Sequence, residues 1–384
     1  MLKFMADLKP KTWIEVSRSA LRYNAAELRR VIGSRVKLMA VVKSNAYGHG
    51  TDEVVRAVGA AADWFGVDSL PEALAVRRAG SKKPVLILGY TRLDQLKEAW
   101  RQGFSLTVYN RQTIERLARI AAAAKPAKLH LKIETGTSRQ GILPSELAGL
   151  ARLVARRKNL VLEGVSTHYA NIEDTSDPTY ALSQLRRFKE ALAVLAGLGL
   201  QPPLRHTACS AAALLYPETR FDLARTGISL YGLWSSEVTR KSLADAGADI
   251  DLRPALTWKT VVAQVKELPK GTPVSYGLTE RLDKDSTVAV LPVGYWDGFD
   301  RRLSSVGEVL IRGRRAKILG RVCMNMCVVD VSGVKGVKPE DEVVLLGRQG
   351  RDRISAEEFA GRIHSINYEA VTRINSTLPR RLVK

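Results

Sequence analysis

The sequence predicts an α/β chain in which an N-terminal (β/α)8 barrel is followed by a mainly antiparallel β domain. Between residues 36 and 231, eight short apolar runs alternate with segments of helical period. After residue 248 the helical period fades, and short Val-rich runs between turns replace it. Because 384 residues are many for one hydrophobic core, we expect two domains, 1–247 and 248–384.

The apolar runs of the first part have the length and composition of parallel strands, which are buried on both faces. Eight strands that each lead into a helix close a barrel. An open doubly wound sheet is the alternative, but no glycine-rich dinucleotide fingerprint follows the first strand. The predicted strands are 36–42, 64–67, 85–88, 106–108, 129–133, 160–166, 204–208 and 221–225, and the predicted helices are one from about 52, then 71–78, 93–100, 114–120, 146–154, 181–198 and 211–215.

The second part is predicted to form a small antiparallel β domain, because turns separate its short β-branched runs. One helix and a strand-like tail follow these runs. The predicted strands are 260–265, 287–293, 309–311, 328–331 and 342–346, and the predicted helix is 356–363.

Charge and cysteine content limit the function classes. The net charge of +21 is spread along the chain, and no basic stripe is interleaved with aromatic residues. We therefore expect no nucleic-acid partner. The basic residues are expected to form a solvated face, which would also attract an anionic cofactor. No second Cys or His pair accompanies Cys323 and Cys327, so no metal site is expected. With three cysteines, no signal-peptide core in residues 1–13 and no apolar run of about 18 residues, we expect a cytoplasmic protein without a membrane span.

The first predicted strand leads directly into a lysine. Lys43 follows the apolar run 36–42, and Ser44, Asn45 and two glycines form a turn before a helix start at Thr51. The carboxyl ends of parallel strands carry the ligand-binding loops, so Lys43 belongs to that rim. From its position alone, Lys43 is either a solvated lysine or an amine that forms a Schiff base.

The segment AVVKSNAYGHG (40–50) resembles the cofactor attachment site of alanine racemases. Further motifs follow in the family's order, so the resemblance extends from about residue 13 to 378; they are ARTGISLYG (224–232), SYG (275–277), GYWDG (294–298), GRVCMNM (320–326) and INYEA (366–370). It implies a pyridoxal 5′-phosphate enzyme and a head-to-tail homodimer with shared active sites. Such an enzyme interconverts L- and D-alanine through an external aldimine, with Lys43 and Tyr276 as the two bases, and supplies D-alanine for cell-wall peptidoglycan.

The resemblance also implies which residues bind the cofactor. Barrels commonly hold phosphate with the loops after strands seven and eight, where glycine lets backbone amides approach an anion. Taken singly, Ser210 is equally compatible with a helix cap, Gly227 with a turn and Tyr368 with the core. The implied cofactor-binding residues are Lys43, Tyr47, His168, Ser210, Arg225, Gly227, Ile228 and Tyr368.

Arg225 is the position that predicts the reaction type. The resemblance places it against the pyridine nitrogen, with His168 holding it, whereas a strand-end arginine is otherwise a salt-bridge partner. A guanidinium does not readily give up its proton, so it leaves that nitrogen unprotonated and makes the ring a weaker electron sink. This favours racemisation over transamination or decarboxylation.

The segment HLKIETGTSRQG (130–141) resembles the family's lysine-to-arginine motif. It implies that Arg139 binds the substrate carboxylate near Met324, and that a carbamate on Lys132 orients Arg139. A plain ion pair of Lys132 with Glu134 is the other reading. The chain departs from the family pattern at Glu134, Thr137, Ser138 and Asn325, and Asn325 replaces an expected aspartate.

Four other functions are compatible with parts of the sequence. A serine-preferring or broad-specificity racemase of the same fold is the nearest. A decarboxylase of the same barrel class would have an acidic residue in place of Arg225. A non-catalytic cofactor-carrying module would resemble the barrel alone, and a nucleic-acid-binding protein would depend on the net charge of +21.

Overall fold

The computed structural model describes residues 9–384, and its contacts divide the chain into two compact units. The barrel unit comprises Ser19–Ala46 and Val54–Arg253, and the β unit comprises the chain up to Arg18, Tyr47–Glu53 and Pro254–Lys384. This grouping differs from a single cut after residue 247, because the first strand pairs with a strand of the β unit. Residues 1–8 lie outside the described residues. The expectation that residues 1–13 contain no signal-peptide core and the predicted domain 1–247 both partly depend on them.

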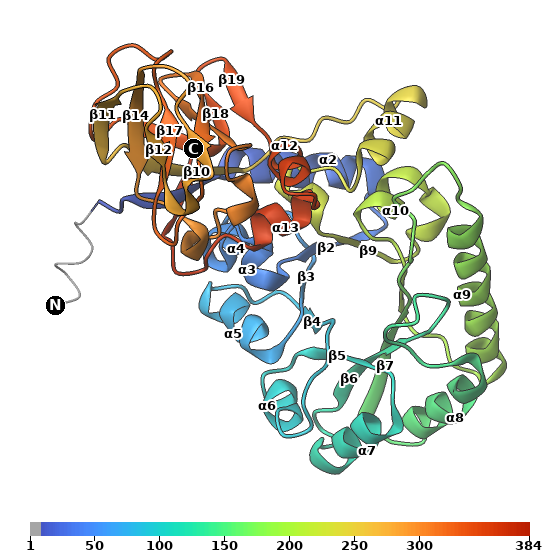
Figure 1. Ribbon diagram of the computed structural model, residues 1–384. Helices are drawn as coiled ribbons and strands as arrows, with labels where there is room; N and C mark the ends of the chain where they lie inside the picture. The colour runs from blue at the N-terminus through green and yellow to red at the C-terminus, as the bar shows by residue number, and fades with distance from the viewer. Residues whose placement is uncertain (1–8) are drawn as a thin grey trace. The chain divides into compact units, whose positions relative to one another are not determined.

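Eight parallel strands form the barrel in the order β8-β7-β6-β5-β4-β3-β2-β9, as predicted (Figure 1). The two edge strands are linked by backbone hydrogen bonds from Asp222 N to Arg205 O (3.0 Å) and from Arg225 N to Ala208 O (2.9 Å), so the barrel is nearly closed. The strands are β2 (Lys37–Val41), β3 (Trp64–Val67), β4 (Val85–Ile87), β5 (Ser105–Val108), β6 (Ala127–Lys132), β7 (Leu160–Ser166), β8 (Leu204–His206) and β9 (Leu223–Thr226).

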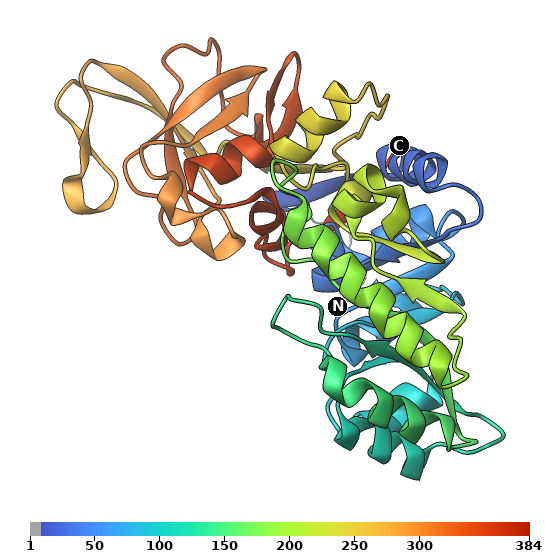
Figure 2. The same ribbon diagram turned by 90° about the vertical axis from the view of Figure 1, so that its right-hand side faces the viewer.

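Helices follow the barrel strands on the outside of the ring, and Figure 2 shows the long α9 on the outer surface of the strands. The helices are α4 (Thr51–Val58), α5 (Leu70–Arg78), α6 (Leu96–Arg101), α7 (Arg111–Ile120), α8 (Pro144–Ala155), α9 (Thr179–Gly197) and α10 (Ser210–Leu215). Two helices, α2 (Arg18–Ile32) and α11 (Glu237–Asp245), are absent from the predicted elements. The pattern of α2 was readable, because Leu21, Ala25, Leu28 and Ile32 recur at helical spacing and are buried. Within residues 9–384, no helix is both long and apolar enough to cross a membrane.

The β unit contains a mainly antiparallel sheet with the strand order β11-β14-β17-β16-β15-β18-β10-β1-β20, in which only β1 and β20 pair in parallel. Its strands are β1 (Thr12–Ser17), β10 (Leu256–Val261), β11 (Gln264–Leu268), β14 (Ser286–Leu291), β15 (Glu308–Ile311), β16 (Arg314–Leu319), β17 (Cys327–Asp330), β18 (Glu342–Gln349) and β20 (Arg380–Val383). Smaller elements are β12 (Pro273–Val274), β13 (Glu280–Arg281), β19 (Asp352–Ile354), α12 (Ala356–Arg362) and α13 (Asn367–Thr372).

The predicted strand 260–265 is wrong, because it joins the end of β10 to the start of β11. Two successive residues between these strands bond to different partners. Val262 N donates to Asp341 O (2.9 Å), whereas Ala263 N donates to Val290 O (2.8 Å). The chain therefore changes neighbours at this point, although its apolar run continues without a break.

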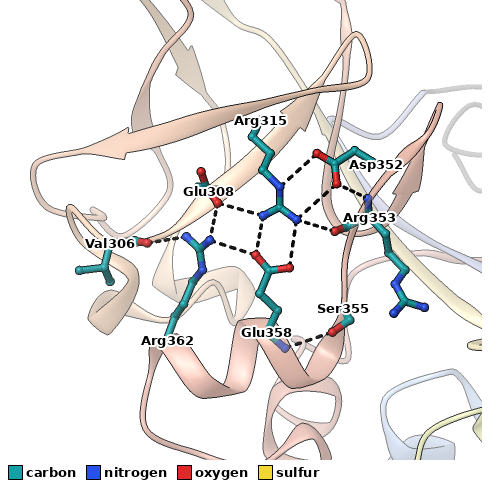
Figure 3. A network of polar contacts seen from close by, with 8 residues as sticks. All are labelled: Val306, Glu308, Arg315, Asp352, Arg353, Ser355, Glu358 and Arg362. Carbon is teal, nitrogen blue, oxygen red and sulfur yellow. Dashed lines mark hydrogen bonds and ion pairs between the residues drawn. The ribbon is translucent and has the colours of Figure 1, made fainter.

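An ion-pair cluster fastens β15, β16 and α12 of the β unit to one another (Figure 3). Arg315 binds Glu308 (2.9 Å), Asp352 (3.1 Å) and both oxygens of Glu358, and Arg362 binds Glu308 and Glu358. Burial alone would raise the pKa of Glu308, but hydrogen bonds from the two arginines outweigh it and lower that pKa. The cluster therefore stabilises the unit at neutral pH.

We expect Arg315→Met to lower the unfolding free energy by about 1–2 kcal/mol, because the carboxylates lose a partly buried guanidinium. Arg353→Met is the matched control, since only the backbone of Arg353 joins the cluster in Figure 3. The depressed pKa of Glu308 gives stability that is complete above the ordinary value of 4.5 and declines as the pH falls below it. Denaturant titrations over a pH series should therefore show the Arg315→Met deficit shrinking in acid; a deficit independent of pH would contradict this account.

Candidate active site

The turn that carries Lys43 is left-handed. Lys43 begins α3 (Lys43–Tyr47), in which Ser44, Asn45, Ala46 and Tyr47 have φ of 55°, 53°, 52° and 52°. Such angles cost non-glycine residues roughly 1–2 kcal/mol each, so the surroundings must hold them. Glu72 does part of this by accepting a hydrogen bond from Ser44 N (2.7 Å). Backbone strain of this kind is typical of functional sites.

Arg225 lies in β9 with only 7% of its surface exposed. Its guanidinium donates to three backbone carbonyls, those of His206 (2.7 Å), Thr167 (2.8 Å) and Thr207 (2.9 Å). It also contacts His206 Nδ1 at 2.8 Å and His168 Nδ1 at 3.5 Å. Burial lowers the pKa of Arg225 to about 10, so the group stays charged at neutral pH, and its many partners fix its orientation.

Lys132, at the end of β6, shares an electropositive environment with Arg225. Burial lowers the pKa of Lys132 to about 7, and the charges of Arg225, Arg139 and Lys43 contribute to the decrease. Burial and the same cations hold the pKa of His168 well below its usual value. A large fraction of Lys132 is therefore a neutral amine near pH 7, in surroundings that favour anionic ligands.

The loops after β8 and β9 meet at Ser210. Its Oγ atom accepts hydrogen bonds from the amides of Gly227 (3.0 Å), which precedes the turn η2 (Ile228–Tyr231), and of Ser229 (3.4 Å), the second residue of that turn. Ser210 does not cap α10, since Cys209 occupies the cap position. The Oγ atom of Ser229 is buried and has no hydrogen-bond partner in the part of the chain that the structure describes. Convergent amides and an unused buried hydroxyl fit a phosphate group.

The loop that carries Arg139 is held by two of the atypical residues. Glu134 accepts hydrogen bonds from the amides of Gly136 (2.6 Å) and Thr137 (2.7 Å). The hydroxyl of Thr137 donates to His168 O (2.6 Å), which ties the loop to the end of β7. The departures at Glu134 and Thr137 therefore have a structural role, and Arg139 itself is exposed.

The SYG motif of the β unit is tied to the GRVCMNM motif. Tyr276 begins the turn η3 (Tyr276–Leu278) and is 73% exposed. Ser275, with a φ of 64°, donates from Oγ to Arg321 O at 2.6 Å. The backbone of this loop therefore presents the Tyr276 side chain to the outside of the unit.

The GYWDG motif lies against the same GRVCMNM segment. Tyr295 N donates to Cys323 O, and Trp296 N donates to Met324 O, both at 3.0 Å. A Cβ atom on Gly294 would lie 2.2 Å from Cys323 O, so only glycine allows this approach. Three motifs that are distant in sequence are thus adjacent in the β unit.

The rings of Tyr47 and Tyr368, which the resemblance assigns to the phosphate, lie 6.1 Å apart between centroids. The structure thus brings Lys132, His168, Ser210 and Arg225 together in the barrel unit, whereas Tyr47, Tyr276, Met324 and Tyr368 belong to the β unit. Ser229 and His206 are absent from the predicted site residues. The motif ARTGISLYG contains Ser229, and a direct signal for His206 was lacking because its contacts are long-range.

Comparison with known proteins identifies the family. Residues 16–235 match the family described as "Alanine racemase, N-terminal domain", and residues 255–382 match "Alanine racemase, C-terminal domain". The chain belongs to the alanine racemase family. An alanine racemase of Desulforamulus reducens is 41% identical over 377 residues, which cover 97% of this chain and 99% of the relative, and one of Methanococcus maripaludis is 38% identical over 371 residues, which cover 96% and 97%.

Solved alanine racemase structures have the same fold over nearly the whole chain. The Bacillus anthracis enzyme with bound L-Ala-P matches with a TM-score of 0.92 and 35% identity, covering 98% of this chain and 96% of that one. The Streptomyces coelicolor enzyme matches with a TM-score of 0.90 and 36% identity, covering 97% and 98%. The predicted family, fold and enzyme class, a pyridoxal 5′-phosphate-dependent isomerase, are therefore confirmed.

Proposed function

We propose that this alanine racemase family member exchanges the Cα proton of alanine with two bases, Lys43 on one face and Tyr276 on the other, and that it supplies D-alanine for peptidoglycan. The observation that carries the proposal is the charged, buried Arg225 in one cationic environment with Lys132 and Lys43. Inversion at Cα requires proton removal on one face and delivery on the other. A lysine amine and a tyrosine hydroxyl can each serve.

Pyridoxal 5′-phosphate, when bound, supplies an electron-withdrawing ring that makes the Cα proton acidic. The residues that would hold it are Lys43, Tyr47, His168, Ser210, Arg225, Gly227, Ile228 and Tyr368. Arg225 keeps its own proton and so limits the electron withdrawal, which favours the return of a proton to Cα. Arg139 would bind the substrate carboxylate near Met324 and hold the Cα–H bond in line with the bases.

We further propose a cytoplasmic homodimer in which each site takes Tyr276 from the second chain. Large apolar side chains are exposed on the β unit, and besides Tyr276 they include Leu278, Trp296, Met324 and Ile366. Such exposure is typical of an interface, and several of these residues belong to the motif loops. Cys209, Cys323 and Cys327 are free thiols, which suits a reducing compartment.

The test is incubation of the purified holoenzyme with single L-amino acids in deuterated water. We expect L-alanine to lose its optical activity with deuterium incorporated at Cα, and L-serine to react more slowly. Chirality and Cα deuterium are recorded together. Retention of L-alanine by enzyme with full cofactor would contradict the proposal, and faster turnover of L-serine would replace alanine with serine as the substrate.

A carbamate on Lys132 is a separate prediction. The neutral amine of Lys132 attacks carbon dioxide, forms a C–N bond and releases a proton. The side chain then carries a negative charge and can accept hydrogen bonds from the Arg139 guanidinium. Labelled bicarbonate should give a carbamate carbon signal near neutral pH, and Lys132→Ala should lose this signal. We expect Lys132→Ala to lower activity roughly 100-fold through misplacement of Arg139, with partial recovery in short carboxylates. Unmodified Lys132 at high occupancy in bicarbonate would be the opposite result.

A further inference from the structure

A chain of hydrogen-bonded side chains runs from Arg225, which is buried, to Glu163, whose side chain is 15% exposed. Arg225 Nη1 lies 2.8 Å from His206 Nδ1, and His206 Nε2 lies 2.8 Å from His130 Nδ1. His130 Nε2 in turn lies 3.1 Å from Glu163 Oε2. His130 and His206 are 0% and 1% exposed, so both rings are shielded from solvent, and each contact in the chain is direct. The chain crosses four strands, β9, β8, β6 and β7.

The two ends of this chain determine the protonation of both rings. A guanidinium nitrogen can only donate, so His206 must accept at Nδ1 and donate at Nε2. His130 must then accept at Nδ1, and its Nε2–H donates to Glu163. Burial lowers the pKa of both histidines, which keeps them neutral. Burial alone would raise the pKa of Glu163, but hydrogen bonds from His130 and Ser105 outweigh it and lower that pKa, so the acceptor is a carboxylate.

The backbone of the barrel is shaped around His130. The pairing of β6 with β7 shifts between Leu129 and His130, which face Leu162 and Gly164, so Glu163 is an extra, bulged residue. A Cβ atom on Gly164 would lie 2.3 Å from His130 Nδ1, so a larger residue would displace the ring. Bulges re-aim side chains, and here a bulge and a glycine together place the carboxylate and the ring.

We propose that His206, His130 and Glu163 are positioning residues for Arg225. Their hydrogen bonds all run in one direction and convey the negative charge of Glu163 to Arg225. This charge keeps the Arg225 proton from the pyridine nitrogen of the cofactor. The proposal deepens the proposed function, since it rests on Arg225 facing that nitrogen. Neutralising Glu163 leaves the guanidinium a stronger donor. The ring then withdraws more electron density, and side reactions such as transamination increase.

The first test uses the wild-type holoenzyme and does not depend on activity. Proton–nitrogen correlation NMR with labelled histidine reports the tautomer of each ring, with assignments from single His variants. We expect His206 and His130 to carry their proton on Nε2, with both signals far downfield. A proton on Nδ1 of either ring, or a doubly protonated ring, would overturn the chain whether or not the enzyme racemises alanine.

The second test neutralises Glu163. Glu163→Gln keeps an oxygen that can accept from His130. Glu146→Gln, at an exposed residue of α8, is the control because it makes the same chemical change outside the hydrogen-bond chain. We expect Glu163→Gln to move the His130 and His206 Nε2 proton signals upfield, to shift the absorption band of the bound cofactor, and to raise transamination relative to racemisation on the order of tenfold. Glu146→Gln should leave the cofactor band in place.

The outcomes separate this proposal from the proposed function. If the tautomers are as expected but Glu163→Gln leaves the cofactor band and the reaction ratio unchanged, Glu163 is merely structural and the proposal fails. If the wild-type enzyme does not racemise alanine, the proposed function fails, whereas the NMR result still decides the hydrogen-bond chain.

Discussion

Mixing inactive Lys43→Ala chains with inactive Tyr276→Phe chains is expected to restore about a quarter of wild-type activity, because half of the exchanged dimers are hybrids and each hybrid has one intact site of two. Each variant alone should lose roughly 10²–10⁴-fold in rate, the usual contribution of an acid–base group. Lys43 belongs to the barrel unit and Tyr276 to the β unit, where its side chain is 73% exposed. This exposure suits a base that acts in the site of a second chain.

The measurement is racemisation rate after subunit exchange, with exchange followed by mass-tagged chains. A double variant, Lys43→Ala with Tyr276→Phe, mixed with Lys43→Ala provides the control, because none of its dimers contains an intact site. Absence of recovery despite complete exchange would show that each chain carries both bases in its own site.

Replacement of Arg225 by glutamate is expected to change the type of reaction. Arg225→Glu removes a buried cation that donates to three carbonyls, and a carboxylic acid in its place supports a protonated pyridine ring. Racemisation should slow by roughly 10²-fold or more, the size typical of lost preorganised electrostatics, and a long-wavelength absorbance band should accumulate during turnover.

Arg225→Lys is the matched variant, since it keeps a positive charge but cannot reproduce the planar set of hydrogen bonds. We expect it to racemise faster than Arg225→Glu and to lack the long-wavelength band. Cofactor content and folding are measured for both variants. Normal racemisation by Arg225→Glu, with no new band, would remove Arg225 from the account of reaction choice.

The barrel was predictable because its evidence is local. Each strand is a short apolar run, and a segment of helical period follows it before the next run, so the alternation is visible along the chain. β1 was missed because its pairing partner, β10, lies more than 240 positions away, as in the contact of Thr12 with Thr260. The break between β10 and β11 was missed for a related reason, because an apolar run does not reveal where the strand changes its pairing partner.

The candidate site divides in the same way. Lys43 and Tyr276 could be proposed because contiguous motifs surround them. The structural roles of Glu134 and Thr137 became visible only with the folded loop, in which they bind amides and a carbonyl. Ser229 could have been suspected from its place two residues after Gly227.

The sequence by itself determined the family, the barrel and the positions of the motifs that contain the two proposed bases, because these depend on periodicity and on residues adjacent in the chain. Only the tertiary structure determined the partners of Arg225. His206 lies 19 positions before it, His130 lies 76 before His206, and Glu163 lies 33 after His130. These side chains meet only when four strands close into a barrel and one bulge re-aims a carboxylate, and no local pattern records either event.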